Sequence, residues 1–346
     1  MKKTSIFVSI LVVLMLTISA CAPKAAEEAA AGDDLFKVAY LTDLGGLAGS
    51  DEMKGFSDLG WDAVLMAEEE GLAIEKTLLE ANELADLEPN LIKMAEEGND
   101  LIIGGGFLFT DAVNAVASQY PDTWFAVIDG YAEGDNVQNI VFASNEGSFL
   151  VGALGAGMTE TGTIAFIGGM EGPLIEAFEA GYNAGAKCID PDVEVLSGYT
   201  GNFTDVAAGK ELALAQYNQG ADVNYAAAGA CVFGAIEAAK ENDFYAVGVD
   251  TDMDSLAPGS VLSSMLKKVD VGTYYTIRDA VNGTFEAGYK NYTLADDTIA
   301  YTKNEWVAED VPAELYDAVD ALAAKIKAGE IVVPMTMEEV ATFSCD

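Results

Sequence analysis

The chain has 346 residues, of which 51% are hydrophobic and 21% charged, with 57 acidic residues against 17 basic ones and a formal net charge of −40. This length predicts two domains of ordinary size, and the acidic surface argues against binding to nucleic acid phosphates or to anionic lipid headgroups. The sequence contains no His, which excludes Ser-His-Asp catalysis and His-ligated metal sites.

Residues 1–20 have the features of a secretory signal peptide. Lys2 and Lys3 precede an apolar stretch at 6–18, which is shorter than the roughly 20 residues that span a bilayer. Small residues then lead to Cys21. This arrangement resembles the bacterial lipobox, in which the cysteine receives the lipid. An ordinary signal peptide followed by a coincidental cysteine is the alternative.

Residues 21–34 contain no large apolar side chain, so we expect them to form a lipidated tether between the membrane and the folded domain. No later stretch is long and apolar enough to span a membrane. The rest of the chain is therefore expected to be exported and soluble.

From residue 35 onward, short apolar runs alternate with amphipathic segments. Helices are predicted at 56–70, around 112–120, at 174–182, at 206–218 and up to about 240, and strands at 36–41, 101–103, 125–129, 163–167, 193–196, 223–227 and 245–249. Apolar strands that alternate with helices predict a parallel sheet covered on both faces. Two such series predict an α/β protein with two doubly wound lobes.

Ligands of doubly wound sheets bind beyond the carboxyl ends of the strands. That rule selects Asp43, the glycines at 104–106, Asp129 and Asp250. Each is a weak signal by itself because Gly and Asp are common in turns. Their recurrence at the ends of successive strands predicts a ligand site at one edge of each sheet.

Several nucleotide and metal motifs fail at defining positions. Gly209 and Lys210 are followed by Glu211, not by the Ser or Thr of a P-loop, and no dinucleotide fingerprint follows the first strand. A calcium loop starting at Asp250 would need Gly at the sixth place and Glu at the twelfth, where Ser255 and Val261 stand. We therefore predict no metal site, no cofactor and no catalytic residue.

Three cysteines follow Cys21, and they leave two arrangements open. Either one disulfide forms beside one thiol, or all three are buried thiols; the residues are Cys188, Cys231 and Cys345.

A set of blocks over residues 36–285 resembles the basic membrane protein family of ABC-importer receptors, also called PnrA-like. The blocks occur in the family's order. They lie at 55–61, 106–112 with 120–122, 145–152, 166–170 with 178–185, 199–205, 247–250 and 263–267.

The resemblance implies a type I periplasmic-binding fold, in which two lobes joined by three crossovers close on a ligand. We expect the N-terminal lobe at 35–142 plus about 254–284, and the C-terminal lobe at 143–253 plus about 285–346. It also implies a binding protein, not an enzyme, that is held on the outer face of the cell membrane by the lipid on Cys21. Such a protein would pass a purine nucleoside to an ABC permease.

Candidate ligand-binding residues follow from matching positions. Phe56 and Phe203, one from each lobe, would sandwich the purine. Asp111 would accept hydrogen bonds from the base, and Asp250 and Lys267 would bind the ribose hydroxyls. The alternatives are that the two rings belong to the core, that Asp111 and Asp250 cap or turn the chain, and that Lys267 is a solvated surface residue.

Two further candidates concern backbone and specificity. Gly229 would let the backbone approach the ligand closely. Ser57 stands where the family has Asn, and Met53 where it has an acidic residue. Both positions lie where a base edge would be read, so they predict an altered base preference.

Two other functions are compatible with this reading. A surface receptor could pass occupancy by another sugar-containing molecule to a signalling partner. An exported enzyme acting on nucleosides or sugars would need a pair of carboxylates, and no such motif is present in the sequence.

Overall fold

The computed structural model of the protein describes residues 35–48 and 53–345. The predicted signal peptide at 1–20, the tether at 21–34 and the lipidation residue Cys21 lie outside the described residues. None of the helices in the described part has the length and apolar character needed to cross a bilayer.

The first sheet has six parallel strands in the order β11-β5-β4-β3-β1-β2. Its strands are β1 (Phe36–Leu44), β2 (Ile74–Ala81), β3 (Leu101–Gly105), β4 (Trp124–Ile128), β5 (Val137–Phe142) and β11 (Gly288–Tyr292). In β1, Val38 and Tyr40 join the core on one face, and Ala39 and Leu41 join the core on the other. Two-sided burial explains why this strand is a continuous apolar run.

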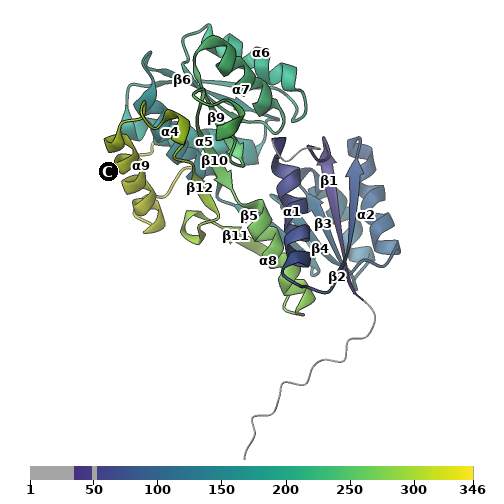
Figure 1. Ribbon diagram of the computed structural model, residues 1–346. Coiled ribbons are helices and arrows are strands. Elements are labelled where there is room, and N and C mark those ends of the chain that lie inside the picture. The colour runs from purple at the N-terminus through teal and green to yellow at the C-terminus, as the bar shows by residue number, and fades with distance from the viewer. Residues whose placement is uncertain (1–34, 49–52, 346) are drawn as a thin grey trace, which may run out of the picture. The chain divides into compact units, whose positions relative to one another are not determined.

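Helices cover both faces of the first sheet (Figure 1). On one face α1 packs against α8, and on the other α2 packs against α3. The helices are α1 (Phe56–Glu69), α2 (Leu87–Glu96), α3 (Thr110–Val116) and α8 (Val269–Val281).

The second sheet also has six strands, in the order β12-β10-β9-β8-β6-β7. They are parallel except for β12, which runs antiparallel to β10. The strands are β6 (Thr163–Gly168), β7 (Glu194–Tyr199), β8 (Val223–Ala227), β9 (Tyr245–Asp250), β10 (Val261–Lys267) and β12 (Ile299–Tyr301).

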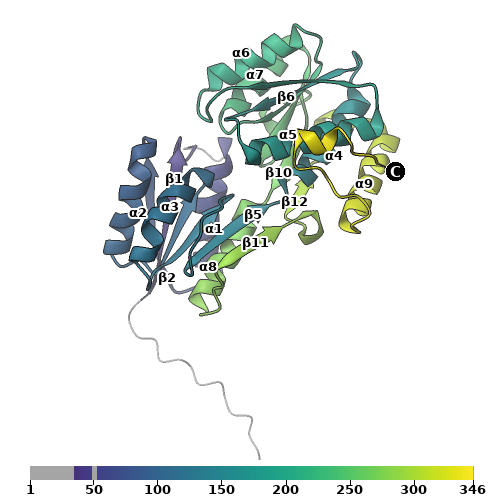
Figure 2. The same ribbon diagram turned by 180° about the vertical axis from the view of Figure 1, so that it is seen from behind.

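Helices α4 and α5 pack against each other on one side of the second sheet, and α6 and α7 do so on the other (Figures 1 and 2). The helices here are α4 (Ser144–Met158), α5 (Pro173–Ile189), α6 (Val206–Tyr217), α7 (Cys231–Asn242), α9 (Ala313–Lys327) and α10 (Met337–Val340). Two doubly wound α/β lobes were predicted, and this fold class is confirmed.

Within residues 53–345 the chain passes between the sheets three times, after β5, after β10 and after β11. Backbone hydrogen bonds hold the connections together: Ala143 N donates to Tyr292 O at 2.8 Å, and Lys268 N donates to Thr298 O at 2.8 Å. The expected three-crossover hinge is therefore present.

The first exchange, after residue 142, lies where the sequence predicted it, but the second and third lie later in the chain. We expected about 254–284 in the first lobe, but β10 in that stretch pairs with β9 and β12 of the second sheet. We expected about 285–346 in the second lobe, but β11 pairs with β5 of the first sheet. Strand pairing across the sheets decides these memberships, and local sequence patterns carry no information on it.

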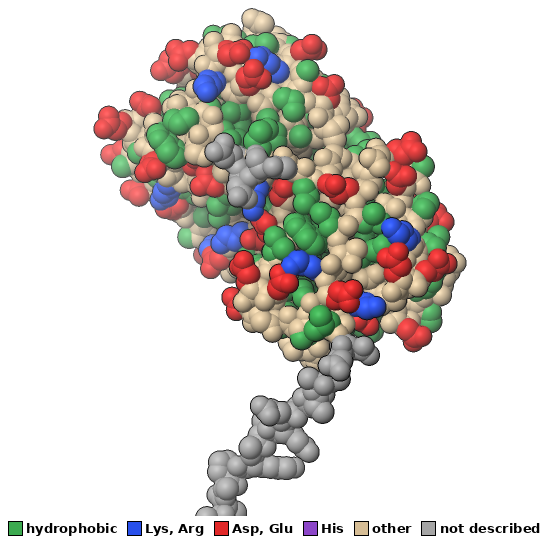
Figure 3. Space-filling view, turned by 45° about the vertical axis from the view of Figure 1, so that its right-hand side comes forward, with side chains coloured by type: hydrophobic (Ala, Val, Ile, Leu, Met, Phe, Trp, Pro, Cys, Tyr) green, Lys and Arg blue, Asp and Glu red, His purple; other side chains and the backbone are tan. Residues whose placement is uncertain are grey.

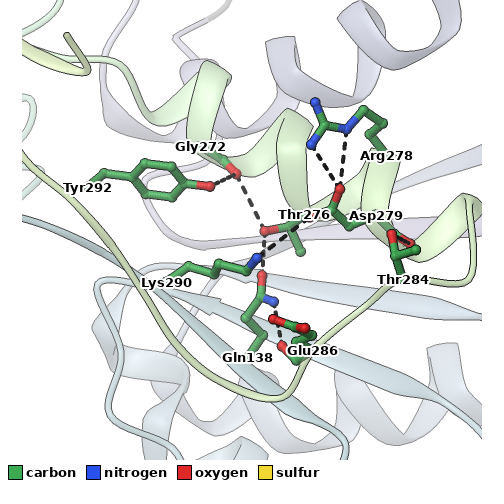
Figure 4. Close-up of polar contacts among 9 residues, drawn as sticks. All are labelled: Gln138, Gly272, Thr276, Arg278, Asp279, Thr284, Glu286, Lys290 and Tyr292. Atoms are coloured by element: carbon green, nitrogen blue, oxygen red, sulfur yellow. Dashed lines mark hydrogen bonds and ion pairs between the residues drawn. The ribbon is translucent and has the colours of Figure 1, made fainter. Parts of the chain in front are cut away.

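A polar network ties α8 and β11 to the first sheet (Figure 4). Thr276 Oγ1 donates to Gln138 Oε1 at 2.6 Å, and Gln138 Nε2 donates to the carbonyl of Glu286 at 2.6 Å. Lys290 Nζ lies 3.7 Å from Asp279 Oδ2. These contacts anchor the segment that returns from the second lobe.

The C-terminal segment is joined to α5 by a disulfide between Cys188 and Cys345. Cys231 is a buried free thiol. Of the two arrangements that the sequence left open, the structure has one disulfide beside one thiol. The same segment is also held by α4, because Asn145 Nδ2 donates a hydrogen bond to the carbonyl oxygen of Val333 at 2.9 Å.

Candidate functional site

A cavity of about 370 Å³ lies between the two sheets and is lined from both lobes. Its volume falls in the range of roughly 300–1,000 Å³ that is typical of small-ligand sites. Most of its lining comes from the carboxyl ends of strands and the loops that follow them, including Asp43 after β1, Gly106 after β3, Gly229 after β8 and Asp250 at the end of β9. Parallel sheets place ligands at this edge.

Phenylalanine rings from both lobes form apolar walls of the cavity. Phe56 begins α1 of the first lobe, and Phe203 lies in the second-lobe loop before α6. Phe107, which follows β3, meets the Phe203 ring edge-on, with 6.0 Å between centroids. Phe56 and Phe203, which were expected to stack on the two faces of a base, therefore line one cavity, and the Phe107 ring lies beside them.

The backbone around Phe203 depends on two glycines. A Cβ at Gly169 would lie 2.1 Å from the Phe203 ring, so the ring covers bare backbone. Gly229 has φ of +55°, and a Cβ there would lie 2.7 Å from the Phe203 carbonyl oxygen. Ala230 N donates to that oxygen at 2.8 Å. Gly229 thus helps to position the Phe203 loop, and it lines the cavity itself.

Lys267, the last residue of β10, supplies a buried ammonium to the cavity and is 1% exposed. It forms an ion pair with Asp129, which follows β4 of the opposite lobe. Its Nζ also lies 5.0 Å from the Phe56 ring centroid, 5.5 Å from that of Phe142 and 5.4 Å from that of Phe178. A desolvated ammonium is stabilised by such rings and by a carboxylate partner.

Two carboxyl groups in the cavity keep an oxygen without a protein partner. Asp129 Oδ1 and Asp250 Oδ1 are buried and accept no hydrogen bond from the described residues. Both residues have a left-handed backbone, with φ of 57° and 66°. Buried polar atoms are nearly always hydrogen-bonded, so these oxygens are acceptors available to a ligand that carries donors.

Burial perturbs the acids of the cavity. It raises the pKa of Asp43 to about 7; the residue's own backbone N–H opposes the rise, and the charge of Asp129 adds to it. Burial also raises the pKa of Asp250 to about 6, with Lys267 opposing the rise. Burial raises the pKa of Asp129 as well, although Lys267 counteracts it. Carboxyl groups with shifted pKa values gathered in a cavity are typical of functional sites.

The remaining sequence candidates divide into two groups. Ser57 and Met53 line the cavity, and the carbonyl oxygen of Ser57 accepts a hydrogen bond from Tyr40 at 3.1 Å. Asp111 is exposed in the first turn of α3 and is absent from the cavity lining. It is not the N-cap either, because that residue is Phe109. At the first turn its charge is favourable to the helix dipole.

The candidate ligand-binding residues did not include Asp43, Phe107, Asp129 or Phe178, all of which line the cavity. The strand-end rule had already marked Asp43 and Asp129, so the signal for them was available. Phe178 lies on α5, whose approach to the cavity depends on how the lobes meet. Among the described residues, no group of three or more Cys, His, Asp or Glu side chains is arranged to hold a metal ion.

The family model for PnrA-like ABC transporter substrate-binding proteins matches residues 38–337. The chain belongs to this family. Its relatives include basic membrane protein A of Borreliella burgdorferi, which is 34% identical over 90% of this chain and 91% of that protein. The CD4+ T-cell-stimulating antigen of Listeria monocytogenes is 30% identical over 86% of this chain and 88% of that one.

A solved ABC transporter solute-binding protein from Aeropyrum pernix K1 has the same architecture. It matches with a TM-score of 0.79 at 27% identity, and the match covers 89% of this chain and 96% of that one. The expected type I periplasmic-binding fold is confirmed, and the PnrA-like protein described here is a solute-binding protein of the ABC transporter class.

Proposed function

We propose that this PnrA-like protein captures a purine nucleoside in the interlobe cavity without transforming it and delivers it to an ABC permease. It would do so as a lipoprotein anchored through Cys21 on the extracytoplasmic face of the membrane. The family resemblance suggests this ligand class. One feature of the cavity supports it: aromatic walls lie beside buried carboxylate oxygens that accept no hydrogen bond from the described residues.

The two parts of that arrangement suit the two parts of a nucleoside. Phe56, Phe107 and Phe203 offer flat apolar surface to a base, and aromatic rings stack on the flat face that every base has. Asp129, Asp250 and Lys267 offer acceptors and donors to ribose hydroxyls. Since both lobes contribute to each part, a bound ligand would favour the closed arrangement of the lobes.

Calorimetry against a panel of nucleosides tests the proposal. Guanosine, inosine and adenosine are compared with cytidine, uridine and free ribose, and we expect at least one purine nucleoside to bind most tightly. After incubation with excess protein, chromatography should recover the nucleoside intact. Absence of heat and of thermal shift with every purine nucleoside, or release of free base, would contradict the proposal.

Replacing Phe203 tests the stacking role. Phe203→Ala removes a ring that faces the cavity, so we expect purine nucleoside affinity to fall about 10- to 100-fold. Tyr289→Ala is the matched control, because Tyr289 is 55% exposed on β11 and does not line the cavity. Equal effects of the two substitutions on Kd would speak against stacking on Phe203.

A further inference from the structure

Acidic groups outnumber the ammonium in the cavity. Lys267 is the one basic side chain among the described lining residues, and Asp43, Asp58, Asp129 and Asp250 line the same space. The Asp58 carboxylate already has backbone partners, since it accepts hydrogen bonds from Gly55 N and Ala48 N, both at 2.9 Å. Three acids at the ends of β1, β4 and β9 are therefore left to share one ammonium.

The ammonium is committed to one of these acids. Lys267 pairs with Asp129, and both side chains are only 2% exposed. Asp250 keeps a buried oxygen without a partner, and Asp43 lines the cavity beside the Phe56 ring. Burial disfavours the ionised form of Asp43 and of Asp250, and the nearby charge of Asp129 adds repulsion, so both acids take up protons more readily than an exposed carboxylate.

We propose that ligand capture in this cleft expels protons from Asp43 and Asp250, so that affinity falls as the surroundings become more acidic. The inference rests on the proposed function, because it assumes a ligand whose hydroxyl and N–H donors point at these carboxylates. An ionised carboxylate accepts such donors through both oxygens, whereas a protonated one has lost acceptor capacity and presents a hydrogen of its own.

The sign and the pH range follow from the two acids. Their pKa values of about 7 for Asp43 and about 6 for Asp250 lie above the ordinary value of 3.8. Donors from a ligand stabilise the ionised forms and lower both pKa values, so binding releases protons near neutral pH and weakens on acidification. The sequence has no His, so no imidazole titrates in this range to obscure the effect.

Other titratable groups near Asp43 stay neutral or have hydrogen-bond partners of their own. Tyr40 has a pKa raised well above its ordinary value, so it stays neutral. Asp58 is held by two backbone donors, and Glu80 accepts from Leu47 N at 2.9 Å. The titratable side chains on the elements around Asp43 are those of Tyr40, Asp58, Glu80, Asp129, Asp250 and Lys267.

Guanosine calorimetry on the unmodified protein between pH 5 and pH 8 tests the inference. If ionised Asp43 and Asp250 are both required, Kd at pH 5 should be about 1,000-fold weaker than at pH 8, with about 100-fold from Asp43 and about 10-fold from Asp250. Repeating the titration at pH 7 in phosphate and in Tris, which differ in ionisation enthalpy, should show release of roughly half a proton per ligand. A constant Kd with no proton release would overturn the inference.

Two variants show which acid is responsible for the pH dependence of Kd. In Asp43→Asn only the part due to Asp250 should remain, about 10-fold between pH 8 and pH 5. Asp122→Asn is the control, because Asp122 is exposed in the turn before β4 and outside the cavity lining; it should keep the full dependence. If Asp43→Asn does not fold, the proton count on the unmodified protein still decides.

The outcomes separate the two proposals. Guanosine that binds with a Kd independent of pH overturns the proton linkage and leaves the proposed function standing. Guanosine and the other purine nucleosides that fail to bind at any pH overturn the proposed function, and the linkage falls with it. An equally steep dependence in Asp43→Asn overturns the role of Asp43.

Discussion

Lys267 ends β10 at the second crossing between the sheets, and its ammonium is enclosed by groups from both lobes. Asp129, Phe56 and Phe142 come from the first lobe, and Phe178 comes from the second. A buried ion pair by itself is weak evidence of stabilisation, because desolvation of both charges opposes their attraction. Removing one partner is different, since the other is left as an uncompensated charge.

Lys267→Met should therefore destabilise the protein strongly. Loss of the ammonium leaves Asp129 buried without its partner, and we expect the free energy of unfolding at pH 7.5 to fall by about 3–5 kcal/mol in urea titrations. Lys303→Met removes a surface pair with Asp320 whose side chains are about half exposed, and it should cost less than about 1 kcal/mol. Similar losses in the two variants would argue against an enclosed charge at Lys267.

The sequence identified most of the candidate residues of the cavity correctly but misplaced one of them. Phe56, Ser57, Phe203, Gly229, Asp250 and Lys267 all line it, because motif blocks and strand ends point to one edge of the sheets. Asp111 does not, since one further turn into a helix is enough to move a side chain from the sheet edge to solvent. The pairing of Asp129 with Lys267 joins residues from opposite lobes, and a single sequence carries no signal for that contact.

At the scale of the elements, α4 and α5 pack so closely that their backbones touch. A Cβ at Gly152 would lie 2.1 Å from Tyr182 O, one at Gly181 would lie 2.1 Å from Asn145 O, and one at Gly185 would lie 1.9 Å from Phe149 O. Glycines on both helices permit this approach. The contact makes α4 and α5 one layer beneath the second sheet.

Gly185→Ala should separate these helices. The added methyl group would meet the backbone of α4, which cannot move aside as a flexible side chain can, so we expect a loss of about 2 kcal/mol or more in unfolding free energy. Gly172→Ala, at the N-cap of α5, is the matched control because a Cβ there has nothing within 4 Å. It should cost less than about 1 kcal/mol. A neutral Gly185→Ala would show that the helices can repack.

The alternation of apolar strands and amphipathic helices predicted the layers of both lobes correctly. What the pattern could not assign was the membership of β10 and β11, which lie next to crossings. The buried run in β10 and the partly exposed β11 would each suit either sheet locally. The choice depends on which neighbouring strand supplies the hydrogen bonds, which is a property of the assembled fold.

For the molecule as a whole, a high net negative charge is combined with a disulfide that links Cys188 to Cys345 in the described part of the chain. Acidic side chains are scattered over the face seen in Figure 3, with basic side chains between them. Self-repulsion of this kind favours solubility but opposes compactness. The Cys188–Cys345 bridge acts in the opposite direction, since it closes a loop over a sequence separation of 157.

Loss of this bridge should lower stability by about 2–5 kcal/mol, because an open chain gains conformational freedom when unfolded. We expect Cys188→Ser to have a lower Tm than the unmodified protein in non-reducing buffer, and dithiothreitol to lower the Tm of the unmodified protein but not that of Cys188→Ser. Cys231→Ala is the control, since Cys231 is a free thiol and the variant should keep its response to dithiothreitol. An unchanged Tm in Cys188→Ser would contradict a stabilising cross-link.

The three crossings also impose an order on biosynthesis. The first sheet receives its edge strand β11 only when residues 288–292 emerge, after nearly all of the second sheet has been made. Until then β5 presents an unpaired edge, which is a template for aggregation. Neither lobe is a contiguous piece of polypeptide, so no single cut of the gene yields an intact half. A nascent chain must instead be kept from misassociating until about five-sixths of its length is available.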